Sequence, residues 1–170
     1  RRNFNVKKNI FIMKIYTIGV YNSTEQQFFS KLIDNNIDTF CDIRQRRGVR
    51  GREYAFVNSN YLQTKLNELD IKYAHILDLA PTSEIREKQK IEDARLGVQK
   101  KSRDVLGSVF TREYKNKISS FDFDEFYDQL DRIGASRVVF FCVEEKVTAC
   151  HRSIVAQEMK ERFKLEVIHL

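Results

Sequence analysis

The sequence predicts an α/β fold: a single three-layer domain with a mainly parallel, roughly five-stranded sheet and helices on both faces. Two observations lead to this expectation. Short apolar runs rich in β-branched and aromatic residues alternate with amphipathic helical patterns, as in parallel sheets covered by helices. The chain has 170 residues, 42% of them hydrophobic, which is enough for one core and too little for two comfortable ones.

Five apolar runs are expected to form the strands, and most of them follow a helical pattern. They cover residues 10–18 (IFIMKIYTI), 37–43 (IDTFCDI), 71–76 (IKYAHI), 137–143 (RVVFFCV) and 165–170 (LEVIHL). In an open parallel sheet, ligands bind beyond the carboxyl ends of the strands, where loops and helix N-termini converge. Candidate functional residues are therefore sought at these strand ends.

Four helical patterns separate the predicted strands. They span residues 23–36, 58–69, 121–134 and 150–163. Ser23 and Gln26 stand at capping-box spacing, as do Asp122 and Glu125, so each pair predicts a helix start. Thr148 is the expected cap of the last helix.

Two segments depart from this alternation. Residues 82–117 are highly charged and have few apolar residues at helical spacing, which predicts a partly exposed helix and a mobile connection. A solvated connecting helix is the simplest interpretation, and a lid or partner surface is the alternative. Residues 1–12 carry basic side chains and are expected to form an extension ahead of a domain at residues 13–170.

Charge and cysteine content narrow the class of protein. Thirty Lys plus Arg against 24 Asp plus Glu give a net charge of +6, which favours nucleic acid, nucleotide or other phosphate partners. Cys41, Cys142 and Cys150 are an odd number of cysteines in a chain without secretory features, so we expect reduced thiols in a cytoplasmic protein. No apolar run approaches the ~20 residues of a membrane span, and no membrane partner is expected.

The strongest basic feature follows the second predicted strand, in the segment CDIRQRRGVRGREY. Five arginines and two glycines within nine residues cannot form a buried strand, and the planar arginine fork suits phosphate or carboxylate. The predicted anion-binding residues in this segment are Arg44, Arg46, Arg47 and Arg50, with Tyr54 as a candidate for base stacking. The alternative is a solvated basic loop or a set of salt bridges.

The fourth predicted strand runs into CVEEKVTACHRS, where a helix is expected to begin. The amides and dipole at a helix start favour an anion and lower a cysteine pKa. We therefore expect Arg152 or His151 to face a ligand or a structural carboxylate. Cys142 and Cys150 are possible reactive thiols, although a packing role is the favoured interpretation of Cys150.

Carboxylates at the same strand ends are candidates for acid–base chemistry. Asp42, Glu144 and the neighbouring Glu145 could move protons; the alternative is charge pairing with Arg44 or Arg152. His151 is the third predicted catalytic group, beside Asp42 and Glu144. The spacing Cys-x7-Cys-His is not that of common zinc modules, so neither a metal nor a cofactor is expected.

Several segments together resemble a known family. YTIG, DIR followed by a basic segment, YAFVNSNYLQTKLNELDIKYAHILDLAPT and CVEEKVTACHRSIVAQEM resemble the DUF488 family, a widespread prokaryotic family whose name records an unknown function. The resemblance covers residues 13–170 and implies an α/β fold, but no reaction. Carried over by position, it points to Asp42, Arg44, Tyr73, His75, Cys142, Glu144, Cys150, His151 and Arg152.

The chain departs from the family pattern in two places. Many members continue the first strand end as Gly-His-Ser, whereas Val20 and Tyr21 follow Gly19 here, so a proton transfer assigned to that histidine has no group to perform it. Many members also carry a proline soon after Asp-x-Arg, and this chain has QRRGVRGRE instead. The chain thus resembles an arginine-rich-loop subgroup, which favours a larger polyanion as ligand.

These observations support three hypotheses. The first is a protein that binds a phosphate-bearing ligand, nucleic acid or nucleotide, at the carboxyl edge of the sheet and acts on it by acid–base chemistry. The second is a non-catalytic module that binds nucleic acid or an anionic partner. The third is rhodanese-like thiol chemistry, which is disfavoured because the loop after Cys142 holds two acids and no glycine-rich cradle. Whether the protein is an enzyme, and its oligomeric state, stay open at this stage.

Overall fold

The computed structural model describes residues 12–170 and confirms the predicted α/β fold. Its centre is a parallel five-stranded sheet in the order β3-β2-β4-β1-β5. The strands are β1 (Lys14–Ile18), β2 (Thr39–Asp42), β3 (Lys72–His75), β4 (Arg137–Phe141) and β5 (Glu166–His169). All five predicted runs contain a strand, each shorter than its run. The predicted extension at residues 1–12 lies, except for its last residue, outside the described residues.

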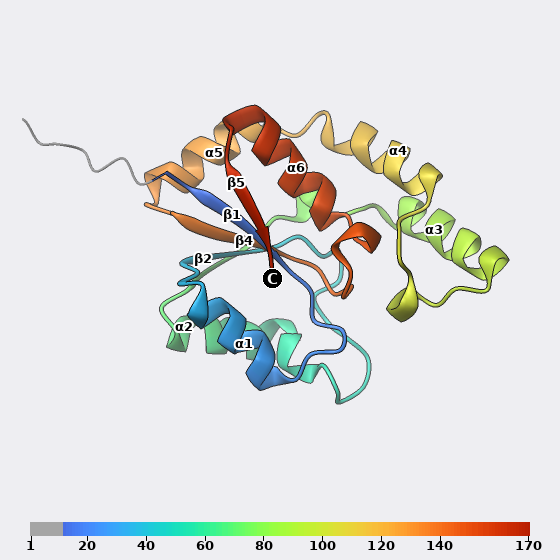
Figure 1. Ribbon diagram of the computed structural model, residues 1–170, viewed down its shortest axis with the longest axis horizontal. Helices are drawn as coiled ribbons and strands as arrows, with labels where there is room; N and C mark the ends of the chain where they lie inside the picture. Colours follow the sequence, from blue (N-terminus) through green and yellow to red (C-terminus); the bar gives the residue numbers. More distant parts are fainter. Residues whose placement is uncertain (1–11) are drawn as a thin grey trace, which may run out of the picture.

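Helices cover both faces of the sheet (Figure 1). On one face lie α1 (Glu25–Asp34) and α2 (Ser59–Glu68), and on the other α5 (Phe123–Arg132) and α6 (Arg152–Phe163). Two further helices, α3 (Ser83–Leu96) and α4 (Ser108–Ile118), lie side by side at one end of the molecule. None of the helices in the described part of the chain is long and apolar enough to cross a membrane.

Side chains alternate along each strand between two hydrophobic clusters, because successive residues of a strand point to opposite faces. Tyr16 and Phe141 pack with Phe28 of α1 on one face. Ile15 and Phe140 pack with the helices of the other face. Both sides of each central strand are therefore buried, which explains why the strands read as nearly continuous apolar runs.

The start of the first helix differs by one residue from the prediction. Thr24, not Ser23, is the N-cap of α1: its hydroxyl accepts from the Gln27 amide, while the Gln27 side chain accepts from the Thr24 amide. Both registers satisfy the spacing rule for a capping box, since Ser23 and Gln26 are each one residue earlier in the same polar run. Spacing alone could not separate them.

The starts of the last two helices give one agreement and one correction. Asp122 caps α5 by accepting from the Glu125 amide, as predicted. Thr148 does not cap α6; its hydroxyl donates instead to the carbonyl of Asp104, and His151 is the N-cap residue. Asp104 lies in the connection between α3 and α4, far from Thr148 in the sequence, so local spacing could not predict this hydrogen bond.

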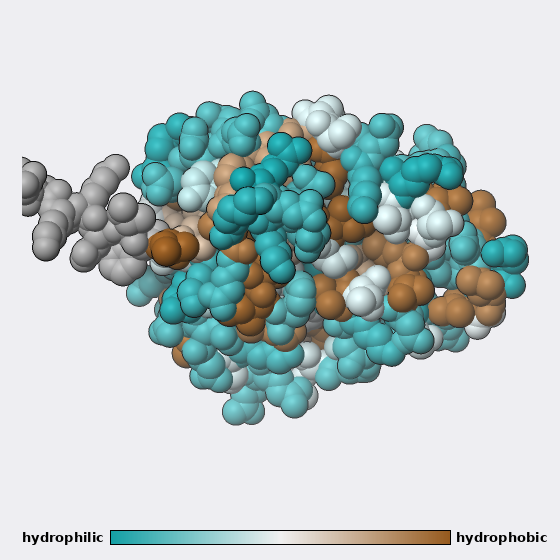
Figure 2. Space-filling view, turned by 45° about the horizontal axis from the view of Figure 1, so that its top comes forward, coloured by the Kyte–Doolittle hydropathy of each residue, from teal (hydrophilic) through white to brown (hydrophobic). Residues whose placement is uncertain are grey.

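The charged segment 82–117 forms α3 and α4, where a partly exposed helix and a mobile connection were predicted. Its apolar side chains are divided. Ile85 and Phe110 join the core, whereas Ile91, Leu96 and Val105 are exposed. Figure 2 shows hydrophobic side chains, in brown, at the end of the molecule where α3 and α4 lie, as well as in the middle of the same face.

The strand order sets the place of the site. β4 lies between β1 and β2, and the helix that follows β4 covers the opposite face from the helices that follow β1 and β2. The connections after β1 and β2 therefore lead to one face of the sheet and the connection after β4 leads to the other. This divergence leaves a crevice at the carboxyl ends of the three strands. The loops after β2 and β4, both singled out from the sequence, meet there.

Candidate functional site

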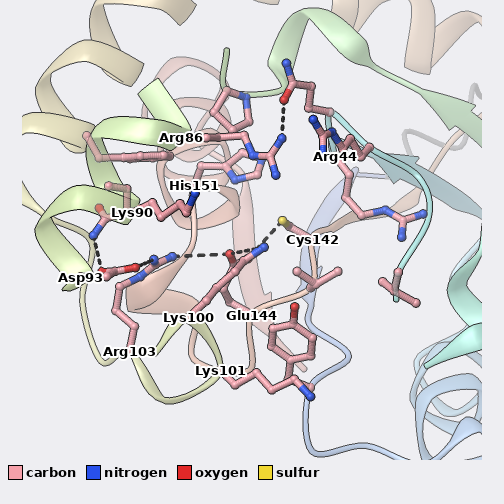
Figure 3. Close-up of a pocket in the computed structure, with 18 of the residues that line it drawn as sticks. Arg44, Arg86, Lys90, Asp93, Lys100, Lys101, Arg103, Cys142, Glu144 and His151 are labelled. Carbon is pink, nitrogen blue, oxygen red and sulfur yellow. Dashed lines mark hydrogen bonds and ion pairs between the residues drawn. The ribbon is translucent and has the colours of Figure 1, made fainter. Parts of the chain in front are cut away.

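A cavity of about 660 Å³ opens at the carboxyl edge of the sheet (Figure 3). The loops after β1, β2 and β4 line it together with α3 and the connection from α3 to α4. Eight cationic side chains reach its wall, against three carboxylates. The cations are Arg44, Arg46, Arg50, Arg86, Lys90, Lys100, Lys101 and Arg103, and the carboxylates are Glu87, Asp93 and Glu144.

The arginine loop after β2 supplies one wall of the cavity. Arg46 and Arg50 are exposed there. The Asn58 side chain accepts from the Val49 amide at 2.7 Å, which holds the loop against the start of α2. Arg47 is not part of the lining; the neighbouring Tyr73 raises the pKa of its guanidinium.

Asp42 and Arg44 form a closed ion pair at the end of β2. Arg44 Nε donates to Asp42 Oδ1 at 2.9 Å and Nη2 to Oδ2 at 2.7 Å, and the Tyr73 hydroxyl donates to Oδ2 at 2.9 Å. His75 Nε2 lies 2.8 Å from the Arg44 carbonyl oxygen. Asp42 is fully buried and does not line the cavity, so the structure places this predicted proton carrier in a sealed network.

Two tyrosines lie together at the cavity wall. The rings of Tyr21 and Tyr54 are 5.3 Å apart, and Lys101 Nζ lies 5.5 and 5.2 Å from their centroids. Tyr54 is buried, and its hydroxyl accepts from the Asn22 amide. Tyr21 is the more exposed ring of the pair, so the aromatic surface combines the predicted Tyr54 with Tyr21, which was not predicted.

Glu144, at the end of β4, lines the cavity and is nearly buried. Lys100 Nζ and Arg103 Nη2 lie 3.5 and 3.4 Å from its Oε1. These partners differ from the predicted ones, Arg44 and Arg152. They come from the charged segment that precedes α4, which the fold brings across the mouth of the crevice.

Arg103 connects this segment to the sheet edge. Its Nη1 donates to Asp93 at 2.7 Å and its Nη2 to the Ala149 carbonyl at 2.9 Å, besides facing Glu144. Arg103 is itself buried. The connection between α3 and α4 therefore forms one side of the cavity, attached through buried charged groups.

Arg152 lies beneath the cavity and is not part of its lining. It is 1% exposed, and its Nη1 and Nη2 donate to the backbone carbonyls of Glu144 at 2.6 Å and Glu145 at 2.9 Å. Gly19 packs against the same turn, because a Cβ built on it would stand 2.0 Å from the Glu144 carbonyl oxygen. The predicted anion ligand Arg152 thus holds the turn after β4 in this structure.

Two thiols and an imidazole meet at the floor of the cavity. Cys142 and His151 line it, and Cys150 Sγ lies behind them, 3.9 Å from His151 Nδ1. His151 Nε2 is 2.9 Å from the Ile43 carbonyl oxygen. The ligand atoms of the three residues lie within 4.8 Å of one another, so they could hold a metal ion, although their spacing in the sequence predicted none.

The pKa values of this group diverge. Although burial opposes a thiolate, the neighbouring Cys142 thiol and the positive charge of Arg152 hold the pKa of the Cys150 thiol well below its usual value. The neighbouring Cys150 thiol and burial raise the pKa of Cys142. Burial disfavours the imidazolium, but the Cys150 thiolate raises the pKa of His151. Of the two thiols, Cys150 is therefore the more acidic.

The contribution of segment 82–117 to this site was not predicted from the sequence. Five of the eight cavity cations come from it, namely Arg86, Lys90, Lys100, Lys101 and Arg103. Their positions follow no strand end, so the search at strand ends passed over them. The available signal was the density of basic residues in a segment that breaks the alternation of strands and helices.

Comparisons with known proteins agree with the resemblance noted in the sequence. The model of the family described as Domain of unknown function DUF488 matches residues 24–159, which is most of the chain. No curated protein and no solved structure matched.

Proposed function

Because the chain belongs to the DUF488 family, whose name assigns no activity, we propose a function from the cavity: the protein binds a phosphate-bearing ligand of nucleotide size. The ligand is a free nucleotide or the end of a nucleic-acid strand. One observation carries the proposal, namely the eight cationic side chains against three carboxylates in the cavity wall. Such an excess in a concave, partly desolvated site attracts anions.

The size of the cavity favours a small ligand. Sites for small molecules commonly enclose about 300–1,000 Å³, and the 660 Å³ here lie within that range. The exposed guanidinium groups of Arg46 and Arg50 can each bind a phosphate with two hydrogen bonds. The rings of Tyr21 and Tyr54 offer an aromatic surface for a base.

Acid–base chemistry on this ligand is the catalytic form of the proposal. Glu144 and His151 both line the cavity, so either could exchange a proton with a ligand there. A non-catalytic binding role is the second candidate, favoured by the two cations that neutralise Glu144. Glu144→Gln separates the two: it abolishes turnover of phosphate esters if Glu144 carries the proton, and leaves ligand binding in place in both cases.

The binding test compares a nucleoside with its 5′-phosphates by calorimetry at low and high salt. We expect the triphosphate to bind, the nucleoside to bind at least about tenfold more weakly, and affinity to fall with salt. Arg46→Ala and Arg50→Ala should each weaken binding about tenfold. Arg112→Ala is the matched control, because Arg112 is exposed on α4 and outside the cavity.

Two results would overturn the proposal. One is equal affinity for nucleoside and nucleotide, since the phosphate would then contribute nothing. The other is an equal loss of affinity in Arg112→Ala and Arg46→Ala, because binding would then depend on the net charge of the protein and not on the cavity.

A further inference from the structure

We propose that Cys142, Cys150 and His151 bind one zinc ion at the floor of the cavity, with a fourth coordination position open to the cavity. Two thiolates and one imidazole are the ligand types that zinc prefers in proteins. The three side chains come from the end of β4 and the start of α6. They form one cluster only because the loop between these elements turns back on itself.

The distances suit a tetrahedral ion. Ligand atoms bound to zinc at about 2.3 Å (sulfur) and about 2.0 Å (nitrogen) stand roughly 3.5–3.8 Å apart in tetrahedral geometry. Here Cys150 Sγ lies 3.9 Å from His151 Nδ1, and all three ligand atoms are within 4.8 Å of one another. Movements of the ligand atoms by about 1 Å, through side-chain rotation, would bring them to tetrahedral distances.

The imidazole is oriented as a metal ligand. A carbonyl oxygen can only accept, so the 2.9 Å contact with Ile43 places a proton on His151 Nε2. In the neutral ring this leaves the lone pair on Nδ1, the nitrogen that faces Cys150. Metal-binding histidines characteristically donate their other ring N–H to a carbonyl or carboxylate in this way.

The position of the cluster points to an open site. Cys142 and His151 line the cavity while Cys150 lies behind them, so the fourth position of an ion held by all three would face the cavity. Glu144 Oε2 stands 3.2 Å from Cys142 Sγ, close to that position. Sites with three protein ligands and one exchangeable position are typical of catalytic zinc.

The charges of the cluster balance. Two thiolates neutralise the ion, and binding releases to solvent any proton that the two sulfur atoms or His151 Nδ1 carry. Nearby, the carboxylate of Glu144 is offset by Arg103 and Lys100. A buried neutral centre avoids the cost of an unpaired charge in the protein interior. The fourth ligand, a water or an oxygen of the phosphate-bearing ligand, rests on the proposed function, whereas the three protein ligands do not.

Cys41 is the internal contrast. It lies in β2, fully buried against the hydrophobic cluster of the α5 and α6 face, and burial raises the pKa of its thiol to about 12. It is absent from the cluster of possible metal ligands found among residues 12–170. Cys41→Ala is therefore a matched variant that removes one thiol and leaves the site intact.

The test is to reconstitute the reduced full-length protein with zinc, remove excess ion by gel filtration and measure the bound metal by mass spectrometry. We expect one equivalent for the natural chain and for Cys41→Ala. Cys142→Ser, Cys150→Ser and His151→Gln should each lower zinc affinity at least about tenfold. Circular dichroism of each variant reports whether it has folded.

Cobalt substitution needs no variant. Co²⁺ in the natural protein should show the intense visible bands of a tetrahedral ion and near-ultraviolet bands from thiolate ligands. Absence of thiolate bands, or less than about half an equivalent of zinc after reconstitution, would overturn the inference. So would a Cys142→Ser/Cys150→Ser double variant that binds zinc as tightly as the natural chain.

The same samples separate this inference from the proposed function. Nucleotide binding by chelator-treated protein that takes up no zinc would leave the proposed function standing and remove the metal site. Zinc binding without any preference for a nucleotide over a nucleoside would do the reverse.

Discussion

Two buried carboxylates stand at the same edge of the sheet, on the neighbouring strands β2 and β4, and their surroundings differ. Asp42 accepts from Arg44 and Tyr73 over 2.7–2.9 Å and has no exposed surface. Glu144 lines the cavity, and its cationic partners Lys100 and Arg103 stand 3.4–3.5 Å away. The first pair is closed around its carboxylate, although Arg44 also reaches the cavity wall, whereas the second pair has longer contacts and its carboxylate itself faces the cavity.

The difference indicates that the charge of Asp42 serves to hold the structure together, whereas the charge of Glu144 can take part in ligand binding. Every donor around Asp42 is held in place by the protein itself. Removing either partner of the pair would therefore leave the other charge buried and unpaired. The cations near Glu144 also face the cavity, where an incoming anion could share them. A strand-end carboxylate is therefore a functional candidate only when its partners are loose and accessible.

The largest expected effect breaks the closed pair. Asp42→Asn leaves the Arg44 guanidinium buried without its counterion and should lower the free energy of unfolding by about 3–5 kcal/mol. Glu144→Gln should cost about 1 kcal/mol, because Arg103 keeps Asp93 and Lys100 is half exposed. Urea denaturation measures both. Equal losses would show that the two carboxylates do not differ as described.

The second effect concerns the packing of Gly19 against the turn after β4, which carries Glu144. Gly19→Ala places a Cβ 2.0 Å from the Glu144 carbonyl oxygen, a clash with backbone that should cost about 2–3 kcal/mol. Gly48→Ala is the control, since the nearest atom to its added Cβ is 3.8 Å away, on Asn58. A fall in stability for the control as large as that for Gly19→Ala would contradict the assignment.

The third effect is smaller and concerns the hydrogen bond between Tyr73 and the Asp42 carboxylate of the closed pair. Tyr73→Phe removes the hydroxyl that donates to Asp42 Oδ2 and should lower the unfolding free energy by about 1–2 kcal/mol, the lower part of the range for a hydrogen bond to a charged group, because Tyr73 is only half-buried. The denaturation midpoint at neutral pH measures it. No change would mean that Arg44 alone satisfies the carboxylate.

Tyr73 also gives the pair a dependence on alkaline pH. Burial and the Asp42 carboxylate raise the pKa of Tyr73 from 10.0 to about 12. Between these values the unfolded chain has lost the phenol proton and the folded chain retains it, so stability falls as pH rises through this window. Urea midpoints at about pH 9 and about pH 11 should fall less in Tyr73→Phe than in the natural chain. An identical fall would exclude Tyr73 as a source.

Much of the fold was predictable because strands and helices are local patterns. The runs at residues 37–43 and 137–143 carry the periodicity of buried strands in their own letters, and each contains one in the structure. The position of Glu144 and His151 at the cavity followed from the same reasoning, since parallel strands end at a common edge.

Charge partners were not predictable in this way. Arg152 and Arg103 are both buried arginines, yet one holds backbone carbonyls of its own turn and the other crosses from segment 82–117 to Glu144. Their sequence context is similarly polar. Which long side chain reaches which acceptor depends on tertiary distances that no periodicity encodes. The same holds for Cys142, which meets Cys150 and His151 through the fold of a loop.

The smallest expected effect concerns Glu145, the residue next to Glu144. Its side chain is exposed and contacts Asn22 at the surface, and its carboxylate does not line the cavity. Glu145→Gln should leave both the denaturation midpoint and nucleotide affinity unchanged, because solvent screens exposed charges. Calorimetry on the two glutamine variants side by side measures this. A change in nucleotide affinity in Glu145→Gln would mean that the net charge of the protein, and not the cavity, determines binding at this edge of the sheet.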